Sequence, residues 1–341
     1  MQHPFTLSRR AILTLPLALA ACKGRNPLIE LTGATMGTTY NVVAVDPSGD
    51  VTAEAVHAQI ERVLADANAA LSNWDPASEV SRFNAATSTE IIAASPSFLE
   101  VMEAANAVFD ASGGRFDVTL GPLIELWGFG AAGSPSATPS DTAIADALAA
   151  RAATIEVSAD GLRKSDPQTQ VYLSAIGKGH GVDLIGRALE QMGLRDFMVE
   201  VGGDLYTAGL NPDGVPWRIG VETPDLRNPG VQSIVEVSGL GLATSGDYRN
   251  YFEQDGTRYS HILDPMTGRP ITHTTASATV LAENAMLADA WATAMLILGR
   301  EAGLEIARAR DMAVLFIERD TTASDLQFTA SASPRFEALQ A

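Results

Sequence analysis

The sequence predicts an α+β fold, built as one compact unit with two interlocked lobes. Strand and helix patterns alternate irregularly along the chain, whereas a doubly wound α/β fold would alternate them regularly. No Pro/Ser-rich linker divides the chain cleanly. With 341 residues, of which 46% are hydrophobic and 19% charged, the chain is long and apolar enough to bury a substantial core.

The first half is expected to hold a hairpin followed by amphipathic helices. Within residues 51–71, apolar side chains recur at steps of three and four, which places them on one helix face. A second apolar stripe starts at Ser95-Pro96 and stops at Gly113-Gly114, which are ordinary helix start and stop signals. The remaining elements expected here are strands at 28–31 and 38–45, a loop of small residues at 130–140 and a short helix at 141–151.

The second half is expected to be richer in strands. Residues 171–192 begin extended and become helical after a Gly-rich turn. Further strands are expected at 197–201, 217–222, 233–237 and 276–281, followed by helices at 284–298 and 301–310 and a final strand at 314–317. No internal repeat is visible.

The charge balance disfavours nucleic acid as a partner. Lys and Arg number 23 against 41 Asp and Glu, which gives a net charge of -18 and a pI near 4.6. Such a chain repels nucleic acid and anionic membranes. The single cysteine excludes an intrachain disulfide and a cysteine-based zinc or iron–sulfur centre, so a redox cofactor would have to be organic or haem.

Residues 1–22 are predicted to be an export signal. Arg9 and Arg10 form a twin-arginine signature before an apolar run that is far shorter than the ~20 residues of a membrane span. The run ends at Cys22 in a sequence that resembles a lipobox, so Cys22 would be lipidated and become the mature N-terminus. Ordinary cleavage after an Ala-x-Ala pattern is the alternative. Residues 23–341 are expected to form one domain in the periplasm, anchored to the membrane if Cys22 is lipidated.

Five segments carry more Gly, Asp, Thr and His than packing requires. They are Thr32–Thr38 (TGATMGT), Gly114–Pro122 (GRFDVTLGP), Ser174–Gly179 (SAIGKG), Ser260–Pro270 (SHILDPMTGRP) and Ala288–Thr293 (ADAWAT). Together and in this order, they resemble the ApbE-type FAD:protein FMN transferase family over about residues 30–320.

The resemblance implies an activity, a cofactor and a fold. A periplasmic enzyme of this family would split FAD and attach FMN through a phosphoester to a threonine or serine of an acceptor protein in a membrane or periplasmic redox system, releasing AMP with the help of Mg²⁺. The fold it implies has mixed or antiparallel sheets and a flavin cleft between the two lobes. Which acceptor is modified stays open.

Asp289 and Thr293 are the predicted metal ligands. They lie four residues apart on an expected helix, so their oxygens project from one face, and Mg²⁺ prefers such hard oxygen ligands. The resemblance adds the main-chain oxygen of Ala175. Some family members carry a second Asp where this chain has Ala292, so one carboxylate and weaker Mg²⁺ binding are expected. In the alternative, Asp289 is a solvated helix residue and Thr293 packs in the interior.

Lys178 is predicted to contact phosphate. The glycines around it let backbone N–H groups approach an anion at a helix N-terminus, and its ammonium adds a point charge. The spacing of a Walker P-loop and the GxGxxG fingerprint are both absent. A surface turn with a solvated lysine is the alternative.

The resemblance also assigns flavin or adenine contacts. Family positions that flank the flavin map onto Met36 and Trp74, and the second is usually tyrosine; both residues are otherwise core candidates. Tyr172 stands where the family has Asp, which puts one ribose or adenine contact in doubt. The other contacts that the resemblance implies map onto Arg115, Phe116, Asp117 and Leu263. The segments 202–204 and 245–248 are either cleft walls or ordinary turns.

His261 is the best candidate for a general base. A threonine hydroxyl has a pKa far above 7, and an imidazole within hydrogen-bond distance can take its proton. Asp264 would either orient that imidazole or hold the Asp-Pro turn. His180 and His273 lie next to matched segments and are secondary candidates.

Two rival functions remain at this stage. An FAD pyrophosphatase would use the same metal site with water as the nucleophile. A flavin-carrying lipoprotein without activity is suggested by Thr32–Thr35 (TGAT), which resembles the acceptor motif that such transferases modify. A buried strand and turn would not present that hydroxyl to another enzyme, which argues against the carrier.

Overall fold

A single large antiparallel sheet organises the molecule. The computed structural model describes residues 28–131, 133, 137–149, 151, 155–322 and 326–341. The sheet has the strand order β1-β2-β5-β6-β9-β14-β15-β16. Its strands are β1 (Leu28–Thr35), β2 (Thr38–Val45), β5 (Asp196–Val201), β6 (Asp204–Ala208), β9 (Leu240–Gly246), β14 (Thr275–Ala282), β15 (Ala313–Arg319) and β16 (Phe328–Ala332). Every pairing in the sheet is antiparallel, and the α+β class is confirmed.

Both faces of the sheet are covered. Four long helices gather on one side, α1 (Ala53–Leu71), α3 (Pro96–Ala111), α6 (Gly177–Gln191) and α7 (Ala285–Ala309). The ribbon of β7 (Trp217–Glu222) and β8 (Val231–Val237), with the short helix α8 (Pro334–Glu337), covers part of the other face. Along β15, Val314 and Phe316 join the helical core, while Leu315 and Ile317 join the ribbon core. Burial on both faces explains why residues 313–317 of this strand are apolar without interruption.

The predicted opening hairpin is confirmed. Its two-residue turn consists of Met36 and Gly37, both with positive φ (50° and 74°), as in a type I′ turn. The turn brings Met36 against α6, where a Cβ on Gly181 would lie 2.9 Å from the Met36 Cε atom. Glycine at position 181 therefore makes room for the hairpin turn.

The two closing helices expected from the sequence together form α7, which is interrupted at Gly299. This glycine has φ 72° and ψ 171° inside α7, which no helical residue adopts. At the start of α7, the Asn284 side chain accepts from the backbone N–H of Leu287. The buried Asp183 carboxylate of α6 accepts from the N–H groups of Ala285 and Met286 at 2.8 and 3.0 Å. The N-terminus of α7 is thus fixed by α6.

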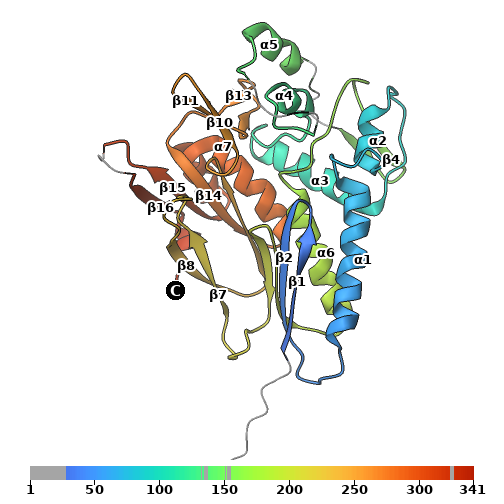
Figure 1. Ribbon diagram of the computed structural model, residues 1–341, viewed down its shortest axis with the longest axis vertical. Coiled ribbons are helices and arrows are strands. Elements are labelled where there is room, and N and C mark those ends of the chain that lie inside the picture. Colours follow the sequence, from blue (N-terminus) through green and yellow to red (C-terminus); the bar gives the residue numbers. More distant parts are fainter. Residues whose placement is uncertain (1–27, 132, 134–136, 150, 152–154, 323–325) are drawn as a thin grey trace, which may run out of the picture.

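A smaller layer at the top of Figure 1 forms the second lobe. It contains α4 (Gly121–Leu126), α5 (Asp141–Ala149), the hairpin β10 (Tyr251–Gln254)–β11 (Thr257–Ser260) and the short pair β12 (Leu263–Asp264)–β13 (Arg269–Pro270). Its own apolar cluster includes Leu123, Trp127 and Ile144. The Trp127 Nε1–H group donates to the Gly268 carbonyl at 2.8 Å, which joins α4 to the turn after β12.

Several elements differ from the sequence prediction. The last strand is β16, not residues 314–317, and the glycines at 177–181 lie inside α6 rather than in a turn before it. The pattern also missed α2 (Glu79–Ala85), the pair β3 (Glu156–Ser158)–β4 (Gly161–Arg163) and the central strand β9. Strand β9 has the sequence LGLATSG, whose small residues have low strand propensity.

The predicted export signal at residues 1–22, with Cys22, lies outside the described residues. Among the helices that the structure does describe, none is both long and apolar enough to cross a membrane.

Candidate active site

Two adjoining cavities contain most of the predicted site residues. The first has a volume of about 520 Å³ and is lined from both lobes, by Leu205 and Leu242 of the sheet and by Leu120 and Leu263 of the smaller layer. The second has a volume of about 450 Å³. Ser174 and Lys178 line both cavities. Nine predicted residues line the first cavity: Phe116, Asp117, Tyr172, Ala175, Lys178, His261, Leu263, Asp289 and Thr293.

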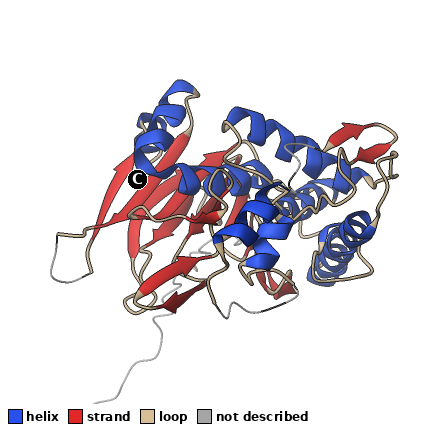
Figure 2. Ribbon diagram, turned by 90° about the horizontal axis from the view of Figure 1, so that it is seen from above, coloured by secondary structure: helices blue, strands red, loops and turns tan. Residues whose placement is uncertain are grey.

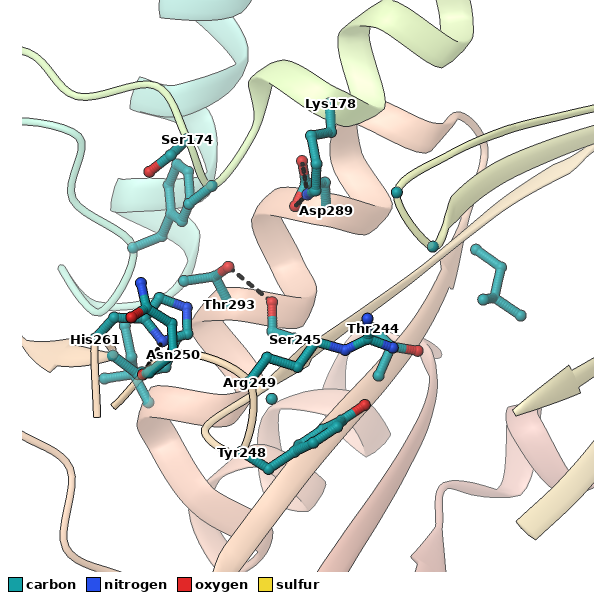
Figure 3. Close-up of a pocket in the computed structure, with 18 of the residues that line it drawn as sticks. Ser174, Lys178, Thr244, Ser245, Tyr248, Arg249, Asn250, His261, Asp289 and Thr293 are labelled. Atoms are coloured by element: carbon teal, nitrogen blue, oxygen red, sulfur yellow. Dashed lines mark hydrogen bonds and ion pairs between the residues drawn. The ribbon is translucent and has the colours of Figure 1, made fainter. Parts of the chain in front are cut away.

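The predicted metal ligands all line the first cavity. Asp289 and Thr293 project from the same face of α7, one turn apart, and Ala175 lines the same space. Only 3% of Asp289 is exposed, so the alternative of a solvated helix residue is wrong. The Thr293 hydroxyl lies 2.9 Å from the Ser245 hydroxyl of β9, as Figure 3 shows. These are hard oxygen donors of the kind that Mg²⁺ prefers.

Lys178 lies between two buried carboxylates. Its Nζ atom is 2.5 Å from Asp204 Oδ2 and 3.3 Å from both carboxylate oxygens of Asp289. Asp204 reaches this position because Gly202 and Gly203, both with positive φ, form the tight turn between β5 and β6. The ammonium that was predicted to be a free charge for phosphate is therefore already paired.

Burial and charge both act on this cluster. Burial disfavours a charged Lys178, but attraction to Asp204 and Asp289 outweighs it and raises the pKa of the ammonium. Burial, together with the neighbouring Asp289 carboxylate, raises the pKa of Asp204 well above its usual value. Two carboxylates thus share a single ammonium in a space that excludes most water.

Gly179 of α6 serves helix packing. A Cβ on Gly179 would lie 2.2 Å from the Ala285 carbonyl oxygen, so α6 and α7 come together closely at this point. The Gly179 N–H group at the start of α6 donates to Asp289 Oδ2 at 3.2 Å. The N-terminus of α6 therefore binds a protein carboxylate, and the phosphate contact expected for this turn stays a prediction.

His261 lies on the wall of the first cavity with its imidazole fixed by backbone. Its Nδ1 atom is 3.0 Å from the Asn250 carbonyl, which also accepts from the His261 backbone N–H. Because a carbonyl only accepts, Nδ1 carries the proton and Nε2 is left as the acceptor. Burial lowers the pKa of His261, and the hydrogen bond to Asn250 opposes this shift. A neutral imidazole with an open Nε2 can act as a general base.

Asp264 does not orient His261. Its Oδ1 atom accepts from Arg115 Nη1 at 3.0 Å and from the Met266 backbone N–H at 2.9 Å. Its carbonyl accepts from the N–H of Gly268 at 2.8 Å. Of the two roles left open by the sequence, the contacts fit the turn-holding one. Neither Arg115 nor Asp264 lines either cavity, which argues against direct contact with a ligand.

The buried polar groups of Asp117 and Tyr172 have protein partners. Asp117 Oδ1 accepts from the backbone N–H and the hydroxyl of Thr119, both at 2.7 Å, while Arg151 Nε is 3.2 Å from Oδ2. Burial raises the pKa of Asp117. The Tyr172 hydroxyl donates to Glu125 and accepts from the Ala131 N–H. Burial and, after it, the hydrogen bond to Glu125 raise the pKa of Tyr172 to about 12.

Met36 and Trp74 line the second cavity. Trp74 is 58% exposed and is therefore not a core residue. Its ring meets the edge of the Tyr172 ring at a centroid distance of 6.0 Å and an interplanar angle of 78°. An exposed indole that borders a cavity suits stacking on a flat ring system.

The other histidines lie elsewhere. His180 is fully buried, with Nε2 3.0 Å from the Ser97 hydroxyl, and lines neither cavity. Burial lowers the pKa of His180 to about 4. His273 packs against Gly299. Neither secondary candidate can serve as the base.

Sequence reasoning did not single out four further residues. Arg249 and Asn250 line the first cavity, and the Arg249 guanidinium pairs with the exposed Glu222 at 2.7 Å. Asp204 and Ser245 were taken as parts of Gly-rich walls or turns, and their pairing with Lys178 and Thr293 was not foreseen. Gly202, Gly203, Gly246 and Tyr248 do line the cavity, as the cleft-wall alternative expected.

The charge of the first cavity fits an added cation. Its ionisable lining is acidic, with four carboxylates against two cations: Asp117, Glu200, Glu222 and Asp289 against Lys178 and Arg249. A diphosphate would be repelled by this lining unless a divalent cation reduced the charge. The Lys178 ammonium already forms an ion pair with Asp289, so the surroundings of this carboxylate accept a positive charge. Within the part of the chain that the structure describes, His, Cys, Asp and Glu side chains nowhere gather in threes around a possible metal position.

Comparison with known proteins gives consistent matches along the chain. The family model described as the ApbE family matches residues 36–316. The chain is 43% identical to a Vibrio cholerae protein named FAD:protein FMN transferase, over 88% of this chain and 90% of that one. It is 35% identical to the Escherichia coli K12 protein of the same name, over 99% and 98% of the two chains.

Solved structures agree with the sequence matches. The flavin transferase ApbE from Vibrio cholerae superposes with a TM-score of 0.84 at 39% identity, covering 92% of this chain and 99% of the other. The flavinyl transferase ApbE from Pseudomonas stutzeri, in its apo form, also gives 0.84, at 37% identity and with 92% and 97% coverage.

Proposed function

Because this chain belongs to the ApbE family, we propose that it transfers FMN from FAD to a threonine or serine of an acceptor protein with the help of Mg²⁺. The observation that carries the proposal is that His261 lines the same cavity as the proposed oxygen donors Asp289, Thr293 and Ala175. The second cavity, with Trp74 at its rim, adjoins it through Ser174 and Lys178. A flavin and a diphosphate joined in one molecule can therefore lie across both spaces.

Asp289, Thr293 and the Ala175 carbonyl would hold the metal. Mg²⁺ neutralises phosphate oxygens and stabilises the leaving group in phosphoryl transfer. The chain itself supplies an anionic carboxylate, a hydroxyl and a carbonyl, which leaves ligand positions for substrate oxygens. The buried α7 helix fixes both side-chain donors from one face.

The proton of the acceptor hydroxyl goes to His261 Nε2 in this proposal. The acceptor oxygen attacks the phosphorus of the FMN half of FAD, and a new oxygen–phosphorus bond forms. The bond from that phosphorus to the bridging oxygen breaks, and AMP leaves with the electron pair. His261 is neutral at pH 7 because its pKa is lowered, so the base is ready without prior deprotonation.

The decisive experiment separates transfer from hydrolysis. The purified protein is incubated with FAD and Mg²⁺, with and without a protein fragment carrying a flavinylation motif, and AMP release and in-gel flavin fluorescence are measured. We expect AMP release to depend on the acceptor and to match covalent flavin. AMP released at full rate without acceptor would instead identify an FAD pyrophosphatase, in which water replaces the threonine.

Intact mass tests the carrier alternative in the same sample. Thr35, the last residue of the TGAT segment, is buried in β1 and accepts a hydrogen bond from Asn68 Nδ2 at 3.2 Å. Its hydroxyl is therefore poorly placed for modification by another enzyme. We expect the unmodified mass, whereas an added FMN on the purified chain would support a flavin carrier.

The same Mg²⁺-dependent reaction tests the metal site. Asp289→Ala removes the only carboxylate assigned to Mg²⁺, and losing electrostatic stabilisation of this kind costs a factor of about 10² to 10³ in rate. FAD binding should be largely kept. Turnover at the wild-type rate across a Mg²⁺ titration would show that the metal binds elsewhere.

The site of action is proposed to be the periplasm. The twin-arginine signature at Arg9 and Arg10 supports export, and the lipobox-like sequence before Cys22 supports a lipid anchor.

A further inference from the structure

The cluster of Lys178, Asp204 and Asp289 poses a problem for metal binding. The carboxylate assigned to Mg²⁺ already has a positive partner, because the Lys178 Nζ atom lies 3.3 Å from both Asp289 oxygens. A metal that binds Asp289 would therefore compete with this ammonium for the carboxylate. The side chains of Asp204 and Asp289 are only 3% and 4% exposed, whereas that of Lys178 is 30% exposed, so the ammonium has room to shift between two fixed, buried carboxylates.

Asp204 offers the place to which the ammonium can withdraw. Its Oδ2 atom is 2.5 Å from Lys178 Nζ, closer than either oxygen of Asp289. Asp204 does not line either cavity, so it stands behind the lysine as seen from the space where a ligand would bind. The ammonium can give up Asp289 while it keeps its shorter contact with Asp204.

We propose that Lys178 is an internal counter-ion that occupies Asp289 in the absence of metal, and that Asp204 is the positioning residue that holds Lys178 when a divalent cation displaces it. This inference rests on the metal site of the proposed function and adds a competition to it. Lys178 lowers the affinity of Asp289 for Mg²⁺, and Asp204 limits that competition. Neither role is that of a metal ligand or a catalytic residue.

The consequence is that removing a lysine tightens metal binding. In Lys178→Met, Asp289 has no internal cation as a partner, so a divalent cation can bind it without competition. In Asp204→Asn, the ammonium has only Asp289 as an anionic partner and competes more strongly. In the double variant no ammonium remains, so the Asn substitution should then have little effect.

The test is isothermal titration calorimetry with Mg²⁺ alone, on the protein without FAD. We expect Lys178→Met to bind Mg²⁺ about tenfold more tightly than wild type and Asp204→Asn about tenfold more weakly, since close buried charge pairs couple at least this strongly. The double variant should match Lys178→Met within about twofold. Unchanged or weaker Mg²⁺ binding in Lys178→Met overturns the proposal. It is also overturned if Asp204→Asn weakens Mg²⁺ binding equally in the wild type and in the Lys178→Met background.

Three control variants separate the possible explanations. Lys178→Arg keeps the charge and should keep the weak affinity. Arg249→Met removes another cation of the cavity, one that pairs with Glu222 and not with Asp289. If this variant gains as much Mg²⁺ affinity as Lys178→Met, only the overall charge of the cavity matters. Asp289→Ala should abolish the measured binding, and wild-type affinity in that variant would contradict the metal site itself rather than the competition.

Thermal melting accompanies each titration. If Lys178→Met does not fold, Lys178→Gln carries the same expectation, because it also removes the charge. The weaker Mg²⁺ binding expected in Asp204→Asn is an independent test. Unchanged Mg²⁺ affinity in that variant, when it is folded, also contradicts the proposal.

Discussion

At His261 the protein fixes the imidazole with a backbone carbonyl instead of a carboxylate. The Asn250 carbonyl accepts from Nδ1, so the ring gains an orientation and a tautomer without a hydrogen-bonded carboxylate. Burial, the largest cause, lowers the pKa of His261, whereas the charge of Asp247 raises it and that of Lys178 lowers it. Asp264, which the motif suggested for that task, instead binds Arg115 and its own turn. A base that must be neutral to work benefits from this choice.

This arrangement predicts how activity depends on pH. Below its pKa the imidazole is protonated and cannot accept the hydroxyl proton, so transfer should fall as the pH falls. Because burial lowers that pKa, the midpoint of the acidic limb in kcat should lie below 6.5. The measurement is the rate of covalent flavin formation between pH 4.5 and 8.

His261→Asn should reduce the rate of transfer by a factor of about 10² to 10⁴, because general-base catalysis typically contributes this much. The acidic limb of the pH–rate profile should also disappear, because it reports the titration of the imidazole. FAD binding should change little, since the base acts on the transition state more than on the bound substrate. Asp264→Asn is the matched control: a loss of thermal stability with the limb retained fits a turn residue. If the acidic limb of the pH–rate profile persists in His261→Asn, another group causes it.

Single residues were predictable where their chemistry is local. Asp289 and Thr293 line one cavity, as expected, because four-residue spacing on a helix is enough to bring two side chains to the same face. The partners of Lys178 were not predicted from the sequence, because Asp204 lies on a strand 26 positions away and Asp289 lies on a helix 111 positions away. Their meeting depends on how α6 packs against β6 and α7, which no local pattern contains.

At the scale of elements, the contact between α6 and α7 positions the site. Gly179 permits the close approach, its N–H group binds Asp289, and Asp183 holds the first N–H groups of α7. The sequence showed these glycines clearly but suggested a phosphate loop. A glycine that admits another backbone and one that admits a phosphate look the same in a sequence.

Gly179→Ala tests this contact directly. The added Cβ would lie 2.2 Å from the Ala285 carbonyl oxygen, so the helices must separate, and overpacking of this kind costs about 1 to 3 kcal/mol of unfolding free energy. Gly177→Ala is the matched control, because its Cβ would meet nothing within 4 Å. That variant should be neutral or gain up to about 1 kcal/mol. Chemical denaturation measures both, and equal stability of the two variants would contradict the packing role.

Asp183 should make the same contact sensitive to pH. Burial raises the pKa of this carboxyl from 3.8 to about 6, although its hydrogen bonds to Met286 and Ala285 oppose the shift. The folded protein therefore binds a proton between these values that the unfolded chain has lost. The resulting stabilisation is full below pH 3.8 and is lost as the pH rises to about 6, by about 3 kcal/mol.

Comparing wild type with Asp183→Asn isolates this effect, because asparagine does not titrate. The difference in unfolding free energy should shift against the wild type by about 2 kcal/mol between pH 4 and 6.5, which is most of the full effect. A constant difference over that range would mean that Asp183 titrates normally. Arg187 and Glu100 also act on Asp183, so the substitution is best tested with both present.

For the whole molecule, the sequence predicted the class better than the topology. The hairpin, the helices and the α+β class followed from periodicity, because each depends on neighbouring residues. The eight-strand order did not, since the central strand β9 is rich in glycine and small residues and is held by pairing with β6 and β14. Burial between two layers, and not strand propensity, makes that segment a strand.

Export is also a property of the whole chain. If Arg9 and Arg10 direct export, replacing both by lysine should leave unprocessed protein in the cytoplasm, and cell fractionation with mass analysis would show it. Unchanged periplasmic yield would contradict the twin-arginine route. In the same assay, Cys22→Ala should turn a membrane-associated protein into a soluble one, and unchanged fractionation would contradict the lipid anchor.

The exposure of Trp74 gives the second cavity an optical reporter. The other three tryptophans, Trp127, Trp217 and Trp291, are at most 8% exposed, whereas Trp74 is 58% exposed. Iodide in solution should therefore quench the emission of this one indole selectively. A flavin stacked there would shield it from iodide and take up its excitation energy. Occupancy of the cavity can thus be followed by tryptophan fluorescence in the unlabelled protein, before any group is transferred.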